Sequence, residues 1–348
     1  MISFLDDDFS ALNLFIENLK PSLLLILVDE NTHEFCLPLL LGNLETELPF
    51  EIIEIEAGED LKTIETASHL WEILAEFKTD RNALMINLGG GVITDLGGFV
   101  ASTYKRGIKF INIPTSLLGM CDASIGGKTG IDHAFLKNIV GTFSEAEEIF
   151  AFPGFLKTLP FEQLRSGFAE MLKHGLIANE KHWQDLISIT EISAEHLENH
   201  ILRSMEIKEH VVEIDFKEQN IRKTLNFGHT FGHAFESLFL QKENIIPHGE
   251  AVAMGMICET YLSYLQNYIS EETSKHIITA LQFYFPYQTI EGFNDGEITK
   301  LMLNDKKNSS GEIKFSLLER LGKGNFDIKV SENAVLKTLE FYRNLAKQ

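Results

Sequence analysis

Cysteine is scarce in this chain of 348 residues. The three cysteines, Cys36, Cys121 and Cys258, are widely spaced and odd in number. They therefore form neither a disulfide framework nor a cysteine-based zinc site. This cysteine usage predicts a reducing, cytoplasmic compartment.

Positive charge is also in short supply. Thirty Lys and Arg residues face 51 Asp and Glu residues, which gives a formal net charge of −21. The averaged electric field of such a chain repels nucleic acids and anionic lipids. We therefore expect no nucleic-acid partner and no membrane partner, although a local basic pocket is compatible with this balance.

Long apolar runs and a secretion signal are missing as well. The longest apolar run, residues 23–28, is far shorter than the roughly 20 residues needed to cross a bilayer. The first residues lead into Asp6, Asp7 and Asp8 rather than into a cationic start followed by an apolar stretch. We expect a soluble protein that is not exported.

What the chain does contain is enough apolar sequence, 44% of its residues, for about two domains. Over the first 150 residues, short apolar runs bounded by Gly, Pro or Asp alternate with amphipathic segments such as residues 60–78, which predicts buried parallel strands with helices between them. These runs cover residues 23–28, 51–55, 83–88 and 110–113. After Pro160 the apolar residues take helical spacing, and strand patterns nearly vanish until residues 313–317. The sequence thus predicts an α/β domain with a parallel sheet over residues 1–160 and a mostly α-helical domain over residues 161–348.

Two features of the first domain suggest a nucleotide. Residues 89–91 are all glycine and precede a predicted helix over residues 92–101, so that a phosphate could approach the backbone N–H groups of the helix start. Thr94 stands where the third glycine of a GxGxxG fingerprint belongs, and an ordinary glycine-rich turn is an equal alternative. Asp29, beside Asn31, follows the first apolar run and could accept hydrogen bonds from a ribose or act as a helix N-cap.

A second glycine-rich segment, residues 122–138, carries basic and polar side chains. Its Gly-Gly-Lys-Thr sequence is similar to the end of a Walker A loop, but Asp122 occupies the place of the first glycine, which excludes a P-loop. Lys128, Lys137 and Asn138 could bind a phosphate through charge and hydrogen bonds. The alternative is a solvated basic loop.

The strongest pattern lies between residues 222 and 233. Arg222, Asn226, His229 and His233 recur at i, i+4, i+7 and i+11, which predicts a polar stripe along one face of a single helix. A stripe facing the core would be apolar, so this stripe indicates a site.

Two glycines, Gly228 and Gly232, are interspersed with this stripe. Each costs a helix roughly 1 kcal/mol relative to alanine. We expect them to allow the close approach of another backbone.

Histidines four apart, such as His229 and His233, are a plausible metal clamp, although the glutamate of HExxH is missing. Further ligands must then come from elsewhere. His248 begins another apolar helix, and Glu170 lies with Lys173 on the polar face of an earlier helix. A glutamate and two histidines with an open position are a common set for catalytic zinc. Ordinary, structurally satisfied histidines are the alternative.

Several further basic residues stand out in so acidic a chain. They are Lys208, Arg222, Lys306 and Lys307. If they converge with Lys128, Lys137 and Lys173, the pocket suits a small substrate that carries both phosphate and carboxylate. The simpler interpretation of any one of them alone is an ordinary basic side chain on a solvated helix. His174 and Cys121 have no evident partner in the sequence, and we assign them no catalytic role.

Taken together, these segments resemble the 3-dehydroquinate synthase family, a branch of the sugar phosphate cyclase superfamily. The matching segments are residues 58–62, 89–95, 105–107, 114–116, 122–132, 165–173, 225–236 and 247–250. The resemblance implies an N-terminal NAD-binding α/β domain and a C-terminal helical domain that binds metal. It also implies a homodimer in which Arg106 approaches the neighbouring subunit's site.

The resemblance also assigns roles to individual residues. Glu170, His229 and His248 would bind zinc, or cobalt in its place, while His233 would lie beside the substrate. The remaining catalytic and substrate-binding positions would be Arg106, Asp122, Lys128, Asn138, Lys173, Lys208, Arg222, Asn226 and one of Lys306 or Lys307. The cofactor-binding positions would be Asp29, Asn31, Glu59, Lys62, Gly90, Gly91, Val92, Asp95, Thr115, Ser116, Lys128, Lys137, Phe155 and Thr158.

The implied reaction converts 3-deoxy-D-arabino-heptulosonate 7-phosphate into 3-dehydroquinate and phosphate, a step of the shikimate pathway to aromatic amino acids. It would proceed by transient oxidation with bound NAD, phosphate elimination, re-reduction and intramolecular aldol closure. One alternative is another sugar phosphate cyclase, whose substrate would lack the carboxylate that Arg222 and Lys208 suit. A second is a metal-dependent glycerol or alcohol dehydrogenase, which has little use for so many phosphate-binding cations. A nucleotide-binding regulatory module would explain neither Glu170 nor the histidines.

Overall fold

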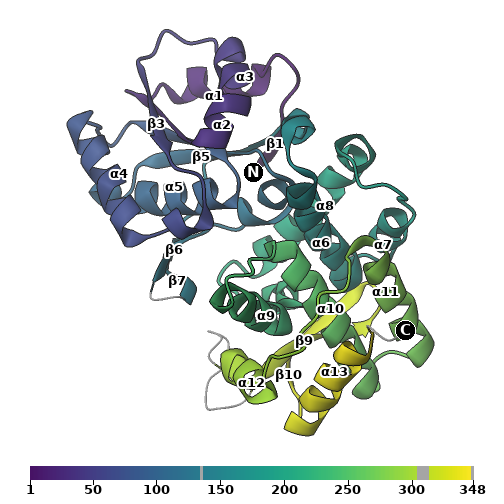
Figure 1. Ribbon diagram of the computed structural model, residues 1–348. Coiled ribbons are helices and arrows are strands. Elements are labelled where there is room, and N and C mark those ends of the chain that lie inside the picture. Colours follow the sequence, from purple (N-terminus) through teal and green to yellow (C-terminus); the bar gives the residue numbers. More distant parts are fainter. Residues whose placement is uncertain (134–135, 304–312, 346–348) are drawn as a thin grey trace. The chain divides into compact units, whose positions relative to one another are not determined.

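The computed structural model describes residues 1–133, 136–303 and 313–345. Its contacts divide the chain into two compact units, Met1–Pro160 and Phe161–Gln348 (Figure 1). None of the described helices combines the length and the apolar character needed to cross a membrane. The three cysteines are free and buried.

The first unit is built on a six-stranded sheet with the order β1-β8-β5-β4-β2-β3, in which every pairing is parallel. The strands are β1 (Ile2–Phe4), β2 (Leu24–Asp29), β3 (Phe50–Ile55), β4 (Leu84–Gly89), β5 (Lys109–Pro114) and β8 (Ile149–Ala151). The helices are α1 (Ser10–Leu19), α2 (Glu30–Phe35), α3 (Leu37–Asn43), α4 (Ile64–Glu76) and α5 (Gly91–Thr103). In Figure 1, α4 and α5 lie on one face of the sheet and α1, α2 and α3 on the other. The predicted α/β fold class is confirmed, and the four predicted strands are β2, β3, β4 and β5.

Two sheet strands escaped prediction because they are only three residues long. Both β1 and β8 lie at one side of the sheet, where β8 joins β1 to β5. A three-residue strand contains too few residues to show a periodicity. Short turns complete this unit: η1 (Glu59–Leu61), η2 (Tyr104–Arg106), η3 (Gly119–Ala123) and η4 (Pro153–Thr158).

The second glycine-rich segment, for which a solvated loop was one of the two interpretations, is strand at its described residues from Lys128 onward. It forms an antiparallel hairpin of β6 (Lys128–His133) and β7 (Leu136–Phe143). Its strands approach so closely at Gly141 that a Cβ there would lie 2.1 Å from the Thr129 carbonyl oxygen. The Thr142 hydroxyl lies 2.7 Å from the hydroxyls of Thr129 and of Ser102 on α5. These contacts hold the hairpin on α5. They outweigh the low strand propensity of its glycines.

The second unit is mostly helical, as predicted. Its elements are α6 (Phe161–Ala178), α7 (Glu180–Ile187), α8 (Ala194–Ile214), η5 (Ile221–Asn226), α9 (His229–Gln241), α10 (His248–Leu265), α11 (Glu271–Tyr284), α12 (Asp295–Leu303), β9 (Lys314–Arg320), β10 (Lys323–Lys329) and α13 (Glu332–Leu345). Helix α10 packs against α6, α9, α11, α13 and β9. It is buried along nearly its whole length, which is typical of a helix at the centre of a domain.

The predicted single helix through the polar stripe is wrong. Arg222 and Asn226 belong to the 3-10 turn η5, and α9 begins only at His229. Gly228 between them has φ of 83°, a left-handed conformation that interrupts the helix. The expected close approach is confirmed, because a Cβ on Gly228 or Gly232 would lie 2.9 Å from a carbonyl oxygen of α10.

The predicted polar face of α6 is also corrected. Glu170 is 0% exposed and Lys173 is 1% exposed, so both side chains lie in the interior. The helix is enclosed along most of its length, with buried residues from Leu164 to Ile177. Two charged side chains facing the interior therefore require partners there.

A buried histidine of this unit makes its stability depend on pH. His182 is 2% exposed, and its Nε2 lies 3.3 Å from the Ser204 hydroxyl, which also contacts His174. Burial, assisted by His200 and Arg203, lowers the pKa of His182 from 6.5 to about 4.

Between pH 7 and pH 5, the unfolded chain takes up a proton at His182 that the folded chain does not. The free energy of unfolding should therefore fall by about 2 kcal/mol over this range because of this residue. Urea denaturation at both pH values should show that His182→Gln loses this part of the pH dependence, whereas the exposed His276→Gln retains it. Equal slopes for the wild type and His182→Gln would contradict the assignment.

Candidate active site

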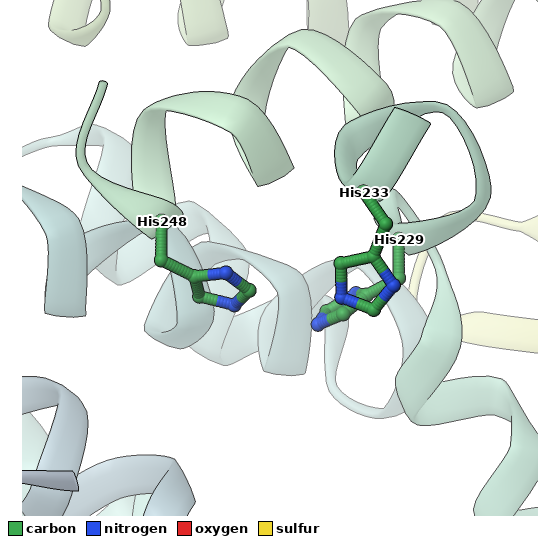
Figure 2. Close-up of side chains that lie close together, drawn as sticks. All are labelled: His229, His233 and His248. Carbon is green, nitrogen blue, oxygen red and sulfur yellow. The ribbon is translucent and has the colours of Figure 1, made fainter. Parts of the chain in front are cut away.

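Four side chains of the second unit converge. Glu170 comes from α6, His229 and His233 from α9, and His248 from the first residue of α10. Figure 2 shows the three imidazoles, which face one another across the starts of α9 and α10, and one nitrogen of each lies within 4.8 Å of the others. This arrangement brings together all the metal-binding candidates of the sequence.

The carboxylate of Glu170 is completely buried and lies near the rings of His229 and His248. Its Oε1 lies 3.5 Å from His229 Nε2 and 3.7 Å from His248 Nε2. Its Oε2 forms an ion pair with Lys173 Nζ. Within the described parts of the chain, Oε1 accepts no hydrogen bond. A buried anionic oxygen that accepts no hydrogen bond, together with the two imidazole nitrogens that it faces, is a suitable ligand set for a divalent cation.

The other ring nitrogens of two histidines face hydrogen-bond acceptors. His229 Nδ1 lies 3.2 Å from the Phe227 carbonyl oxygen, and His248 Nδ1 lies 3.5 Å from Glu236 Oε2. When the proton is on Nδ1, it points to these acceptors, and each Nε2 then keeps a lone pair for an ion beside Glu170. The His233 ring is also near, with its centroid 5.1 Å and 5.9 Å from those of His229 and His248.

The start of α10 is fastened to α6 one turn before Glu170. The Gly249 N–H donates to the Ser166 hydroxyl over 2.9 Å, and a Cβ on Gly249 would lie 2.1 Å from the Ser166 carbonyl oxygen. Glu250 forms an ion pair with Arg165. These contacts fix His248 against the helix that carries Glu170.

Two further candidate cations of this unit are buried. Lys208 on α8 is 6% exposed and Arg222 in η5 is 2% exposed. The loop before Arg222 is shaped by Asp215, which accepts hydrogen bonds from the N–H groups of three residues, Gln219, Asn220 and Arg222. Although burial raises the pKa of Asp215, these hydrogen bonds hold the pKa below its ordinary value.

The other predicted substrate-binding residues of this unit are Asn226, Lys306 and Lys307. The Asn226 side chain donates to Glu218 over 2.8 Å. Lys306 and Lys307 lie outside the described residues.

In the first unit, the three glycines form the end of β4 and the start of α5. Gly90 is the N-cap of α5 and offers no side-chain cap to the first turn, which includes Gly91 and Val92. A Cβ on Gly90 would lie 3.2 Å from the Ser116 hydroxyl, and the Thr115 N–H donates to the Gly89 carbonyl oxygen. The loops that follow the neighbouring parallel strands β4 and β5 therefore lie side by side. They meet at the N-terminus of α5, whose first N–H groups have no side-chain cap. This arrangement suits the phosphates of a dinucleotide.

The structure bears on the two readings of Asp29. Its carboxylate caps α2, accepting from the Thr32 N–H over 2.8 Å, and the Thr32 hydroxyl completes a capping box. The N-cap role is thus present, and the ribose role stays a prediction. Asn31 lies exposed on α2.

A buried lysine connects α5 with the hairpin. Lys62 is 2% exposed, and its Nζ lies 2.5 Å from both Asp95 Oδ2 and Asn138 Oδ1. Burial lowers the pKa of Lys62, but the carboxylates of Asp95 and Glu59 outweigh it, so that the pKa lies above its ordinary value. Lys137 Nζ lies 3.7 Å from Glu59 Oε1. Five predicted site residues are thus neighbours.

The remaining predicted residues of this unit belong to several different elements. Lys128 is exposed at the start of β6, Asp122 lies in η3, and Arg106 is exposed in η2 with φ of 68°. The ring of Phe155 is buried at 3% exposure, and the Thr158 hydroxyl donates to its carbonyl oxygen. The roles given to these residues stay predictions.

Two family models match consecutive parts of the chain. The model of the N-terminal part of 3-dehydroquinate synthase matches residues 52–166, and that of the C-terminal part matches residues 167–308. The chain belongs to the 3-dehydroquinate synthase family. The resemblance found in the sequence is thereby confirmed.

Curated relatives extend the match to nearly the whole chain. The 3-dehydroquinate synthase of Parabacteroides distasonis is 41% identical over 336 residues, covering 96% of this chain and 95% of that protein. The 3-dehydroquinate synthase of Leptospira interrogans is 38% identical over 296 residues, covering 84% of this chain and 81% of that protein.

Solved structures of three kinds of enzyme share the fold. One is 2-epi-5-epi-valiolone synthase from Streptomyces hygroscopicus with NAD+ and Zn2+ bound, with a TM-score of 0.84, 23% identity and coverage of 99% of this chain and 97% of that one. Another is 2-deoxy-scyllo-inosose synthase with carbaglucose-6-phosphate, NAD+ and Co2+, with a TM-score of 0.86, 22% identity and coverage of 99% and 96%. A probable glycerol dehydrogenase from Sinorhizobium meliloti also matches, with a TM-score of 0.64, 13% identity and coverage of 100% and 97%. At these identities the likeness concerns the fold alone, which the three kinds of enzyme have in common.

Sequence reasoning missed the side chains that support the site in this family member. Glu236 and Glu250, near His248, and Asp215, near Arg222, were not given roles. One signal was available for Glu236, because it is an acidic residue within the apolar stretch 234–240. A charged residue in an otherwise apolar helix needs a partner, and its position can be noticed before the partner is known.

The Lys62 ion pair should have a measurable effect on stability. In Lys62→Met, the Asp95 carboxylate loses its ammonium partner in a buried setting, and we expect the free energy of unfolding to fall by about 3 kcal/mol. Adding Asp95→Asn should recover much of this loss, which urea denaturation can measure.

The exposed pair between Lys137 and Glu59 offers a matched control. Lys137→Met should lower the free energy of unfolding by less than about 1 kcal/mol, because exposed ion pairs contribute little. If Lys62→Met and Lys137→Met lowered the free energy of unfolding by similar amounts, the buried ion pair would not contribute more than the exposed one, and the prediction would be wrong.

Proposed function

We propose that this protein is a 3-dehydroquinate synthase. It converts 3-deoxy-D-arabino-heptulosonate 7-phosphate into 3-dehydroquinate and phosphate, and is therefore a carbon–oxygen lyase that uses NAD together with zinc or cobalt. The observation that carries the proposal is 41% identity to a curated synthase across 96% of the chain. Glu170 and the histidines supply the metal-binding chemistry that this reaction needs.

Glu170, His229 and His248 would hold the metal ion. A carboxylate oxygen and two imidazole nitrogens, all within a few ångströms, are a common donor set for catalytic zinc with a position left open. The ion, when bound, polarises a substrate hydroxyl and stabilises alkoxide charge. Lys173 balances the charge of the Glu170 carboxylate through their ion pair.

The cofactor would occupy the glycine turn of the first unit. The backbone N–H groups at the start of α5 suit its pyrophosphate, because Gly90 leaves the helix start without a side-chain cap. Asp29, Glu59, Lys62, Asp95, Thr115 and Ser116 are among the side chains that we assign to it. NAD, when bound, accepts a hydride and returns it, so that no net oxidation results.

The cationic side chains would hold the two anionic ends of the substrate. Lys128, Asn138, Lys173 and Arg106 are assigned to the phosphate, whose negative charge grows as it leaves and is stabilised by ammonium and guanidinium groups. Lys208, Arg222 and Asn226 are assigned to the carboxylate and the hydroxyls.

His233 would act on protons rather than on metal. Its imidazole lies next to His229 and His248 without belonging to the proposed ligand set, and an imidazole can hold or move a proton at a substrate hydroxyl near neutral pH. Arg106, exposed in η2, would reach the neighbouring subunit's site in a homodimer. We assign the protein to the cytoplasm, because free cysteines are typical of proteins in a reducing compartment.

The activity is tested with the heptulosonate phosphate, zinc and an amount of NAD+ far below that of the substrate. Phosphate and dehydroquinate should appear in equal amounts over many turnovers, because the cofactor is regenerated in each cycle. Sedoheptulose 7-phosphate and glucose 6-phosphate serve as controls that lack the carboxylate. Consumption of one NAD+ per turnover, or a clear preference for the controls, would contradict the proposal.

The division of roles among the histidines is tested by two substitutions. His229→Ala should lose bound metal and activity together, each by about 100-fold or more, whereas His233→Ala should retain metal and lose activity. Metal content after dialysis and turnover of each variant provide the measurement.

The exposed His276→Ala should keep both metal and activity. If His233→Ala lost as much metal as His229→Ala, the three imidazoles would form the ligand set instead.

A further inference from the structure

Helix α9 begins without a side chain of its own to cap it. Its N-cap is Gly228, and its first residue is His229, the proposed metal ligand. The first backbone N–H groups of an α-helix have no acceptor within the helix and need one elsewhere. At this buried position the acceptor has to come from another element.

The acceptor is the carboxylate of Glu259, on α10. Its Oε2 accepts from the Gly228 N–H over 2.6 Å, and its Oε1 accepts from the N–H groups of Thr230 and Phe231 over 3.0 Å and 3.3 Å. Glu259 is 0% exposed. A carboxylate at the positive end of a helix dipole makes short, charge-assisted hydrogen bonds. One side chain thus fixes the backbone on both sides of His229.

The glycines explain how Glu259 comes so close. Gly255 precedes it by one helical turn, and a Cβ on Gly255 would lie 1.8 Å from the Gly228 carbonyl oxygen. The backbones of α9 and α10 are therefore in contact at this point. Ser263, one turn further on, donates to the Glu259 carbonyl oxygen and accepts from the Leu318 N–H of β9. The carboxylate is held in a rigid frame.

The hydrogen bonds continue from Glu259 to the imidazole of His229 through one peptide group. The N–H of the peptide between Phe227 and Gly228 donates to Glu259 Oε2, and the carbonyl oxygen of the same peptide lies 3.2 Å from His229 Nδ1. An acceptor on the N–H side of a peptide polarises its carbonyl group, which strengthens the hydrogen bond that this carbonyl accepts. The chain of contacts favours a proton on Nδ1, and Nε2 lies 3.5 Å from Glu170 Oε1.

We propose that Glu259 is a positioning residue for the metal site, acting on His229 through the Phe227–Gly228 peptide. The inference rests on the proposed function, because it takes His229 as a ligand. His248 has the corresponding support directly, from the carboxylate of Glu236. The two histidines are thus each backed by a carboxylate, in one case through a peptide group.

The test uses Glu259→Gln and Glu259→Ala in the full-length protein, with Thr260→Val as the matched control. Thr260 is the next residue of α10, is equally buried, and its hydroxyl makes no hydrogen bond within the described residues. Glutamine keeps one acceptor oxygen, whereas alanine keeps none. Zinc affinity is measured on metal-free protein by competition with a chelator, and cobalt-loaded protein gives a visible spectrum that reports ligand geometry.

We expect Glu259→Gln to bind zinc about tenfold more weakly and Glu259→Ala about 100-fold more weakly than the wild type, as for other residues that orient metal ligands. The cobalt spectrum should change in the same order, and Thr260→Val should match the wild type in both measurements. If both Glu259 variants are folded and keep wild-type affinity and spectrum, the proposal is overturned. Failure of both variants to fold would overturn it as well, by assigning Glu259 to fold stability.

The same measurements separate this proposal from the proposed function. If the wild type bound no zinc, or if His229→Ala bound it as tightly as the wild type, the metal site itself would be wrong. Wild-type binding that depends on His229 but not on Glu259 would contradict only the positioning role.

Discussion

The buried carboxylate of Glu170 places the strongest constraint on the second unit. An ionised carboxylate deprived of water costs several kcal/mol unless charges and hydrogen-bonding groups surround it at the correct distances. Lys173 lies on the same helix, so that α6 provides the first partner by itself. The other partners, His229 and His248, belong to α9 and α10, and the packing of those two helices on α6 must bring them to the carboxylate.

Glycines make that packing feasible. Gly228, Gly232 and Gly255 allow the backbones of α9 and α10 to touch, and Gly249 allows the start of α10 to touch α6. At each contact a side chain as small as alanine would collide with a carbonyl group or another backbone atom. Backbone contacts between helices thus place the metal-binding candidates.

The first unit uses its buried charges in a similar way. Lys62 neutralises Asp95 on α5 and contacts Asn138 on the hairpin, so that one ammonium group connects the predicted cofactor positions with a predicted phosphate position. The glycine turn before α5 leaves backbone N–H groups at a helix start. In both units, residues that weaken local secondary structure, glycines and buried charges, lie at the candidate sites, where function takes precedence over local stability.

The sequence by itself determined the α/β character of the first unit, its four longer strands, the helical character of the second unit and the membership in the family. These features depend on local patterns, namely apolar runs, helical spacing and short motifs whose members are near one another in the chain. The hairpin, the break at Gly228 and the burial of Glu170 were decided only by the tertiary structure. Each of them depends on a neighbour that is distant in sequence, such as α5 for the hairpin and α10 for Gly228. The supporting carboxylates Glu236 and Glu259 belong to the same class, because the chemistry of a buried charge is defined by the partners that folding brings to it, and a single sequence does not record those partners.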